Sequence, residues 1–202
     1  MGGPVSGTEG YGTQADALAV QYENIAFADV HRETMHLFPA TPSRVLDVGA
    51  GTGRDAAALA ALGHVVLAVE PTREMRAHAM RLHGGSGVDW LDDGLPRLDR
   101  VLARGQRFDL ILLTAAWMHL DEAERETGMA ALARLLAPGG RIVMSLRHGP
   151  VPAGRRMFDV AAAETDGLAR RHGLRTVFEG SREGMFGQPG VWWTFLALEA
   201  AI

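Results

Sequence analysis

A glycine-rich run constrains the fold of this chain more than any other feature. It reads Arg44-Val-Leu-Asp-Val-Gly-Ala-Gly-Thr-Gly-Arg-Asp55. The apolar residues before the first glycine predict a short buried strand, and the alanines and leucines after Asp55 predict a helix that ends at Gly63. The three glycines predict a tight turn between them. Such a turn lets a ligand approach the amino terminus of the helix closely.

An acidic residue follows the next predicted strand. Val65-Val-Leu-Ala-Val69 would bring Glu70 to the same edge of the sheet, where a carboxylate can accept both hydroxyl hydrogens of a ribose. The turn and Glu70 therefore predict a nucleoside-cofactor site. Asp47 adds a carboxylate beneath the turn, which suits a ligand with a cationic sulfonium and ammonium better than a pyrophosphate. Arg54 also departs from the sixth-position glycine of the dinucleotide-binding fingerprint G-x-G-x-x-G.

In these residues the chain resembles the class I S-adenosylmethionine-dependent methyltransferases, whose first motif has the form V-L-D-x-G-x-G-x-G. The resemblance continues in the family's order through residues 70–75, 88–96, 108–120 and 136–146. It implies S-adenosylmethionine as cofactor and S-adenosylhomocysteine as product. Together with the alternation of predicted strands and helices, it implies an α/β, Rossmann-like, doubly wound sheet. That sheet would have seven mostly parallel strands, an antiparallel edge hairpin and helices on both faces.

The resemblance assigns cofactor contacts to particular residues. Pro71 would lie against the adenine, and either Asp92 or Asp93 would hydrogen-bond its amine, with Asp93 favoured by the small Gly94 after it. Arg54 would bind the methionine carboxylate, or else pair with a neighbouring carboxylate. Tyr22 would bind the same carboxylate, or else only pack. The predicted cofactor contacts are Tyr22, Asp47, Gly49, Ala50, Gly51, Gly53, Arg54, Asp55, Glu70, Pro71, Met75, Asp92, Asp93, Gly94, Thr114, Ala115 and Trp117.

Candidate catalytic and substrate contacts follow the fourth and fifth predicted strands. His119 and His148 are candidate general bases, which are needed only for a nucleophile that is protonated at neutral pH. For His119, a structural role at a helix start is an equal alternative. Arg147, His148 and Arg156 are candidate substrate contacts, because arginines clustered at a site mouth can grip a carboxylate or phosphate. The chain has 20 basic residues, all of them arginine, and a GC-rich genome also explains this bias.

Length and composition predict one compact domain. The chain has 202 residues, of which 47% are hydrophobic, enough to bury a full core. We expect residues 1–10 to be disordered. Residues 11–202 would form a single methyltransferase domain, with a helical lid over 11–40 and the core over 41–202. Within the lid, the pattern predicts one amphipathic helix from Asp16 to about Val30.

Composition also excludes several kinds of partner. The absence of cysteine excludes disulfides and a thiolate zinc site, and no metal site is predicted. A net charge of −4 argues against a nucleic-acid surface. No apolar run reaches the roughly 20 residues of a membrane span, so a cytoplasmic protein is the default expectation. The sequence leaves the oligomeric state open.

The predicted function is methyl transfer to a small-molecule acceptor by in-line displacement. Thr114-Ala-Ala-Trp117 stands where amino-DNA methyltransferases carry an Asn/Asp-Pro-Pro-aromatic motif, which disfavours that class. One alternative is a non-catalytic module that binds adenosylmethionine or adenosylhomocysteine. A nicotinamide-dependent oxidoreductase is a weaker alternative, because Arg54 and Asp47 depart from its fingerprint.

Overall fold

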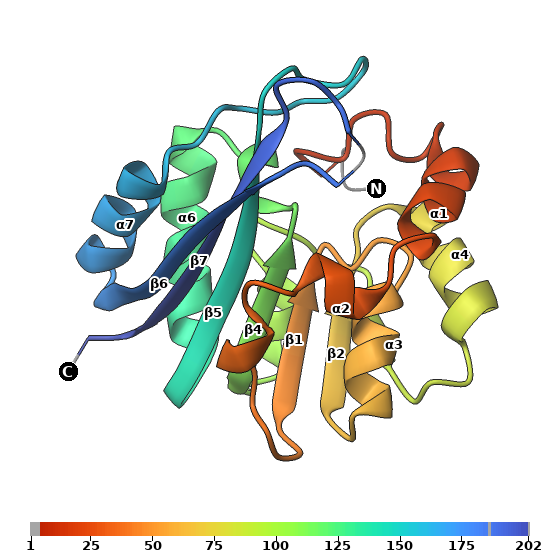
Figure 1. Cartoon of the computed structure of the whole chain (residues 1–202). Coiled ribbons are helices and arrows are strands. Elements are labelled where there is room, and N and C mark those ends of the chain that lie inside the picture. Colours follow the sequence, from red (N-terminus) through yellow and green to blue (C-terminus); the bar gives the residue numbers. More distant parts are fainter. Residues whose placement is uncertain (1–4, 186, 202) are drawn as a thin grey trace.

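A seven-stranded mixed sheet forms the centre of the molecule, seen in a computed structural model that describes residues 5–185 and 187–201. The strand order is β3-β2-β1-β4-β5-β7-β6 (Figure 1). The first five strands are parallel, whereas β7 runs antiparallel to both β5 and β6. The strands are β1 (Arg44–Val48), β2 (Val65–Val69), β3 (Asp89–Leu91), β4 (Phe108–Thr114), β5 (Leu136–His148), β6 (Leu174–Glu183) and β7 (Trp192–Ala200). The predicted fold class, including the antiparallel edge hairpin, is confirmed.

Helices cover both faces of the sheet because successive strand residues point to opposite sides. Leu46 and Val48 belong to a core cluster with α5, α6 and α7. Val45 belongs to the cluster on the other face, with α3. The helices are α1 (Ala15–Glu23), α2 (Phe27–Val30), the 3₁₀ turn η1 (Met35–Leu37), α3 (Arg54–Ala61), α4 (Arg73–His83), α5 (Asp99–Ala103), the 3₁₀ turn η2 (Trp117–His119), α6 (Glu122–Leu135) and α7 (Ala162–Arg171).

The ends of several elements follow from local chemistry. A capping box begins α6: Glu124 N donates to Asp121 Oδ1 over 2.9 Å, and Asp121 N donates to Glu124 Oε2 over 2.8 Å. The single helix expected near residues 16–30 is instead split into α1 and α2, because Ala26 has extended backbone angles. β5 begins at Leu136, which pairs with Phe108 across a register shift.

The amino-terminal segment lies above the carboxyl ends of the central strands (Figure 1). α1 packs on α4, where Ala15 and Leu18 contact the buried Met75. Residues 5–10, expected to be disordered, form turns in which Thr8 N donates to Val5 O over 3.3 Å. Residues 1–4 of that predicted segment lie outside the described residues. No helix in the described ranges has the length and apolar character to cross a membrane.

Candidate active site

A cavity of about 380 Å³ lies at the carboxyl ends of the central strands, beneath the amino-terminal segment. One wall comes from the glycine turn after β1 and from the residues after β2. The opposite wall comes from the residues after β4, the end of β5, the start of β7, and the connection between β6 and β7. Parallel α/β sheets bind ligands at this edge, beside the point where the strand order reverses. Here that point lies between β1 and β4.

The glycine turn requires backbone angles that other residues rarely adopt. Gly49, Gly51 and Gly53 all have positive φ, at 74°, 57° and 86°. A Cβ on Gly51 would lie 3.7 Å from Met75 Cε and 4.0 Å from a ring carbon of Tyr22. A Cβ on Gly53 would lie 2.8 Å from the Trp90 ring. Gly51 therefore leaves space at the cavity wall, whereas Gly53 lets the Trp90 ring pack closely behind the turn.

Glu70 is fixed against this turn. Its Oε2 accepts from Gly51 N over 2.9 Å, and its Oε1 accepts from Thr72 N over 2.8 Å. The side chain is buried but borders the cavity. Burial raises the pKa of Glu70, although the two backbone donors oppose the shift. The carboxylate is thus held in one position at the cavity wall.

Two further carboxylates lie beside the turn. Asp55 contacts His31 Nε2 at 2.9 Å, and it accepts from Arg54 Nε over 2.7 Å and from Thr114 Oγ1 over 2.8 Å. Burial disfavours its charge, but His31 and Arg54 outweigh burial and hold the pKa of Asp55 below its ordinary value. Asp47 is different, because burial and the charge of Asp55 raise its pKa well above the ordinary value. Asp47 Oδ2 finds no hydrogen-bond partner among the described residues.

The opposite wall is basic and apolar. Arg147 of β5 donates to Pro150 O over 2.8 Å and lies 3.5 Å from Gln188 Oε1. The Arg155 guanidinium stacks over the Tyr11 ring, 3.8 Å from its centroid. Apolar side chains line the space between these arginines and the sheet. They are Met118, Met157, Val191, Trp193 and Phe195.

His119 and Tyr11 form a hydrogen-bonded pair at the cavity. His119 Nδ1 lies 2.6 Å from Arg156 O, and because a carbonyl only accepts, Nδ1 carries the proton. Nε2 is then free to accept from the Tyr11 hydroxyl, 2.9 Å away. Burial lowers the pKa of His119, against the effect of the Arg156 carbonyl. The imidazole is therefore neutral at physiological pH, with its lone pair toward Tyr11.

The comparisons with known proteins agree with this arrangement. Residues 45–140, which include the glycine turn and Glu70, match the family described as methyltransferase domain. The chain belongs to the class I S-adenosylmethionine-dependent methyltransferases.

Two relatives show how far the likeness extends. A demethylmenaquinone methyltransferase of Clavibacter sepedonicus is 34% identical over 132 residues, which are 63% of this chain and 51% of the relative. An uncharacterized methyltransferase of Geobacillus kaustophilus is 30% identical over 141 residues, 68% of this chain and 61% of the relative. The chain thus spans between half and two thirds of the length of these relatives.

Solved structures share the methyltransferase fold. A TehB-like methyltransferase from Corynebacterium glutamicum superimposes with a TM-score of 0.70 at 21% identity, covering 93% of this chain and 98% of that one. The Burkholderia thailandensis 1,6-didemethyltoxoflavin-N1-methyltransferase gives a TM-score of 0.64 at 23% identity, covering 100% and 94%. At these identities the likeness concerns the fold alone.

Most of the predicted cofactor contacts border the cavity. These residues are Tyr22, Asp47, Gly49, Ala50, Gly51, Arg54, Asp55, Glu70, Pro71, Gly94, Thr114 and Ala115. Arg54 borders the cavity and also pairs with Asp55, and it donates to Tyr22 O over 3.1 Å. Gly53, Met75 and Trp117 pack behind the cavity wall instead.

Neither aspartate expected at the adenine borders the cavity. Asp93 caps α5, where its Oδ2 accepts from Arg100 N over 2.8 Å and from Val101 N over 3.0 Å. Asp92 points outward and pairs with Arg76 at 2.9 Å. Gly94 alone of this segment's predicted contacts lies at the cavity. No pattern in the sequence predicted that the first amide groups of α5 would bind the Asp93 carboxylate.

His148 faces away from the cavity that Arg147 borders, because neighbouring strand residues point to opposite faces. Its Nδ1 lies 2.7 Å from Asp159 Oδ1 and its Nε2 lies 3.0 Å from Thr194 Oγ1. Its ring stacks on Trp192, with 3.7 Å between the centroids. These contacts give His148 a structural role between β5 and the segment before α7, in place of the expected catalytic or substrate contact.

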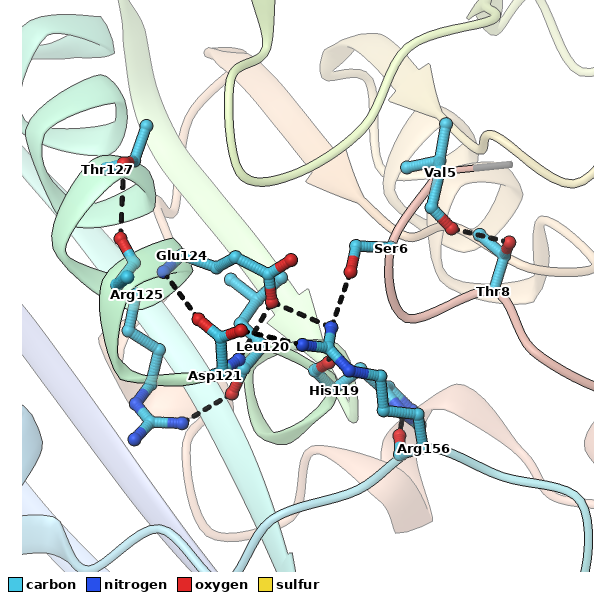
Figure 2. Close-up of polar contacts among 11 residues, drawn as sticks. Val5, Ser6, Thr8, His119, Leu120, Asp121, Glu124, Arg125, Thr127 and Arg156 are labelled. Atoms are coloured by element: carbon cyan, nitrogen blue, oxygen red, sulfur yellow. Dashed lines mark hydrogen bonds and ion pairs between the residues drawn. The ribbon is translucent and has the colours of Figure 1, made fainter. Parts of the chain in front are cut away.

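Arg156 is not among the residues that line the cavity, and its guanidinium lies among Ser6, Asp121 and Glu124 (Figure 2). It pairs with Asp121 at 2.9 Å and with Glu124 at 2.7 Å, and it donates to Ser6 Oγ over 2.5 Å. Arg156 therefore ties the amino-terminal segment to the start of α6, beside His119. Arg156 does not make the predicted substrate contact, because Asp121 and Glu124 neutralise its charge outside the cavity lining.

Sequence reasoning missed Arg182 and Thr72 as cavity residues, and it named Arg155 only as a member of the arginine cluster that could bind an anion. Arg155 and Arg182 line the basic wall, and Thr72 lines the wall beside Glu70. Arg182 reaches the cavity from β6 and pairs with Glu33 at 2.8 Å. The tandem tryptophans of β7 gave a usable signal: alternation predicts opposite faces, and Trp193 lines the cavity while Trp192 is 44% exposed.

Proposed function

We propose that this protein transfers a methyl group from S-adenosylmethionine to a small-molecule acceptor bound in the cavity. The observation that carries the proposal is the position of Glu70. Its carboxylate is held by Gly51 N and Thr72 N beside a turn of three positive-φ glycines. At this edge of an α/β sheet, a fixed carboxylate can accept the hydroxyl hydrogens of a ribose, and a turn without side chains lets the ribose come close.

The residues of this wall fit the rest of the cofactor. Pro71 and Gly94 border the cavity beside Glu70, where the adenine would lie. Asp47 has a buried carboxylate oxygen without a partner among the described residues, which suits a cationic ligand. Arg54, at the amino-terminal end of α3, and Tyr22, on α1, would hold the methionine end. When bound, S-adenosylmethionine supplies a methyl carbon already activated by its sulfonium.

The chain's own residues align the acceptor and exclude water. The acceptor atom forms a bond to the methyl carbon as the carbon–sulfur bond breaks, and the electron pair stays on the sulfur. Enclosure under residues 5–22 limits competition from water. A proton released by the acceptor would pass to His119 Nε2, directly or through the Tyr11 hydroxyl, which gives up its own proton as it receives the acceptor's.

The size of the cavity supports a small acceptor. A volume of about 380 Å³ lies in the range of roughly 300–1,000 Å³ usual for small-molecule sites. The Burkholderia structure of the same fold holds 1,6-didemethyltoxoflavin together with S-adenosylhomocysteine. That likeness supports the size class of the acceptor, not its identity.

Calorimetric titration with S-adenosylmethionine, S-adenosylhomocysteine and NAD tests the proposal. We expect both adenosyl ligands to bind with micromolar dissociation constants and NAD not to bind. Binding of NAD alone would contradict the proposal, because it would show that the glycine turn binds a dinucleotide.

A further inference from the structure

The charges of the cavity are divided between its two walls. Asp47, Asp55 and Glu70 lie on the wall formed by β1, β2 and their loops. Arg147, Arg155 and Arg182 lie on the opposite wall. The acidic wall suits the cationic cofactor of the proposed function. The basic wall therefore calls for a separate explanation.

The arginines of the cavity differ in whether their charge is neutralised. Arg54 pairs with Asp55 at 2.7 Å and Arg182 pairs with Glu33 at 2.8 Å. Across residues 5–185 and 187–201, by contrast, Arg147 meets only the neutral oxygens of Pro150 and Gln188. Arg155 meets the Glu9 carbonyl at 3.2 Å, the Gln14 side chain at 2.9 Å and the face of Tyr11.

Arg147 is the arginine best placed to bind a ligand. It stands on a strand of the sheet, and Trp193, its cross-strand partner on β7, lines the cavity with it. Burial lowers the pKa of Arg147. A partly buried guanidinium without a carboxylate is costly, and a ligand anion would remove that cost.

We propose that the acceptor is an apolar molecule carrying a carboxylate, which the Arg147 guanidinium binds while Trp193, Phe195 and Met118 contact the apolar part. One guanidinium with neutral partners matches the single charge of a carboxylate. This inference rests on the proposed function, because it describes the second ligand of the same cavity. Arg155 lines the same cavity and stacks on Tyr11.

The cofactor also has a carboxylate, so the first measurement is titration of Arg147→Gln with S-adenosylhomocysteine. We expect the affinity of this variant to match that of the native protein within about twofold, since Arg147 lies on the basic wall, where the acceptor would bind. A loss of about tenfold or more, the scale of a lost charged hydrogen bond, would assign Arg147 to the cofactor and overturn the inference.

The second measurement uses matched acids and amides. Benzoate and benzamide, phenylacetate and phenylacetamide, and indole-3-acetate and indole-3-acetamide are titrated into the native protein saturated with S-adenosylhomocysteine. We expect at least one acid to bind about tenfold more tightly than its amide. That preference is lost in Arg147→Gln and partly kept in Arg147→Lys, which retains the charge but not the planar fork.

The matched control is Arg170→Gln, which removes an exposed arginine of α7 that pairs with Asp166. It is expected to keep the preference for acids. The inference is overturned if acids and amides bind equally, if no acid binds at millimolar concentration, or if the preference survives in Arg147→Gln. Failure of the native protein to bind S-adenosylhomocysteine at all would instead reject the proposed function.

Discussion

The two walls of the cavity are built in different ways. The cofactor wall comes mainly from one stretch of chain, residues 47–72, and backbone hydrogen bonds from Gly51 and Thr72 hold its key carboxylate. The acceptor wall joins segments near residues 11, 119, 147, 155 and 193, and side-chain contacts such as those of Tyr11 with His119 and Arg155 link them. A wall fixed by backbone tolerates few changes, whereas a wall of side chains can change with the acceptor. The cofactor is therefore the easier ligand to infer.

The walls also differ in how their charges are balanced without a ligand. On the cofactor wall, the raised pKa values of Asp47 and Glu70 show that burial disfavours their charged forms. On the acceptor wall, Arg147 has only neutral partners within the described part of the chain. On each wall, a ligand of opposite sign would favour the charged forms of these side chains.

The largest expected effect comes from filling the turn of the cofactor wall. We expect Gly51→Val to weaken S-adenosylhomocysteine binding by more than about 100-fold, since backbone strain of about 1–3 kcal/mol adds to the bulk placed in the cavity. Gly87→Val is the matched control, because Gly87 also has a positive φ, at 78°, but an added Cβ there meets nothing within 4 Å. Calorimetry measures both variants, with thermal unfolding alongside. Normal binding by folded Gly51→Val would refute the role given to the turn.

The next effect separates the two walls directly. Glu70→Gln should weaken S-adenosylhomocysteine binding by about 1.5–3 kcal/mol, the scale for a hydrogen bond to a charged group. Arg147→Gln should leave the same affinity almost unchanged. Calorimetric titration of both variants gives the contrast. Equal losses in the two variants would show that the walls do not serve separate ligands.

Asp47→Asn should make the ligand-free protein more stable, by about 1–3 kcal/mol, because it removes the charge of a buried side chain whose Oδ2 has no partner among the described residues. The folded-state pKa of Asp47 is raised, so its charged form costs stability at neutral pH. The gain should shrink as the pH falls through that pKa toward the ordinary range of aspartate. Denaturant unfolding at several pH values measures it.

The same variant should also change the choice of ligand. S-adenosylmethionine carries a sulfonium charge and S-adenosylhomocysteine does not, so Asp47→Asn should cost the former several-fold more affinity. An unchanged ratio of the two dissociation constants would remove Asp47 from the sulfonium role.

The smallest effect concerns the acceptor wall. His119 should titrate below its ordinary pKa of about 6.5, because burial lowers its pKa, and should carry its proton on Nδ1. NMR of the imidazole ring measures both, with His119→Gln to assign the signals. A titration at or above about 6.5 would contradict the neutral base proposed for this wall.

More of the cofactor wall than of the acceptor wall could be predicted from the sequence. The order of motifs predicted the sheet, and local spacing placed Glu70 and the glycines because they follow strands directly. It misplaced Asp93, whose carboxylate the amide groups of α5 take up. The prediction for His148 was also wrong. His148 lies within β5, and the alternation of side chains along the strand points it away from the cavity. Arg182 could not be predicted, since its place depends on how the β6–β7 hairpin packs.

A crystal structure of the protein with S-adenosylhomocysteine tests the division of the cavity most directly. We expect the ribose hydroxyls on Glu70, the amino-acid end toward Asp47 and Arg54, and the Arg147 guanidinium without contact to the ligand. A ribose away from Glu70, or the ligand's carboxylate on Arg147, would contradict the assignment of one wall to the cofactor and the other to the acceptor.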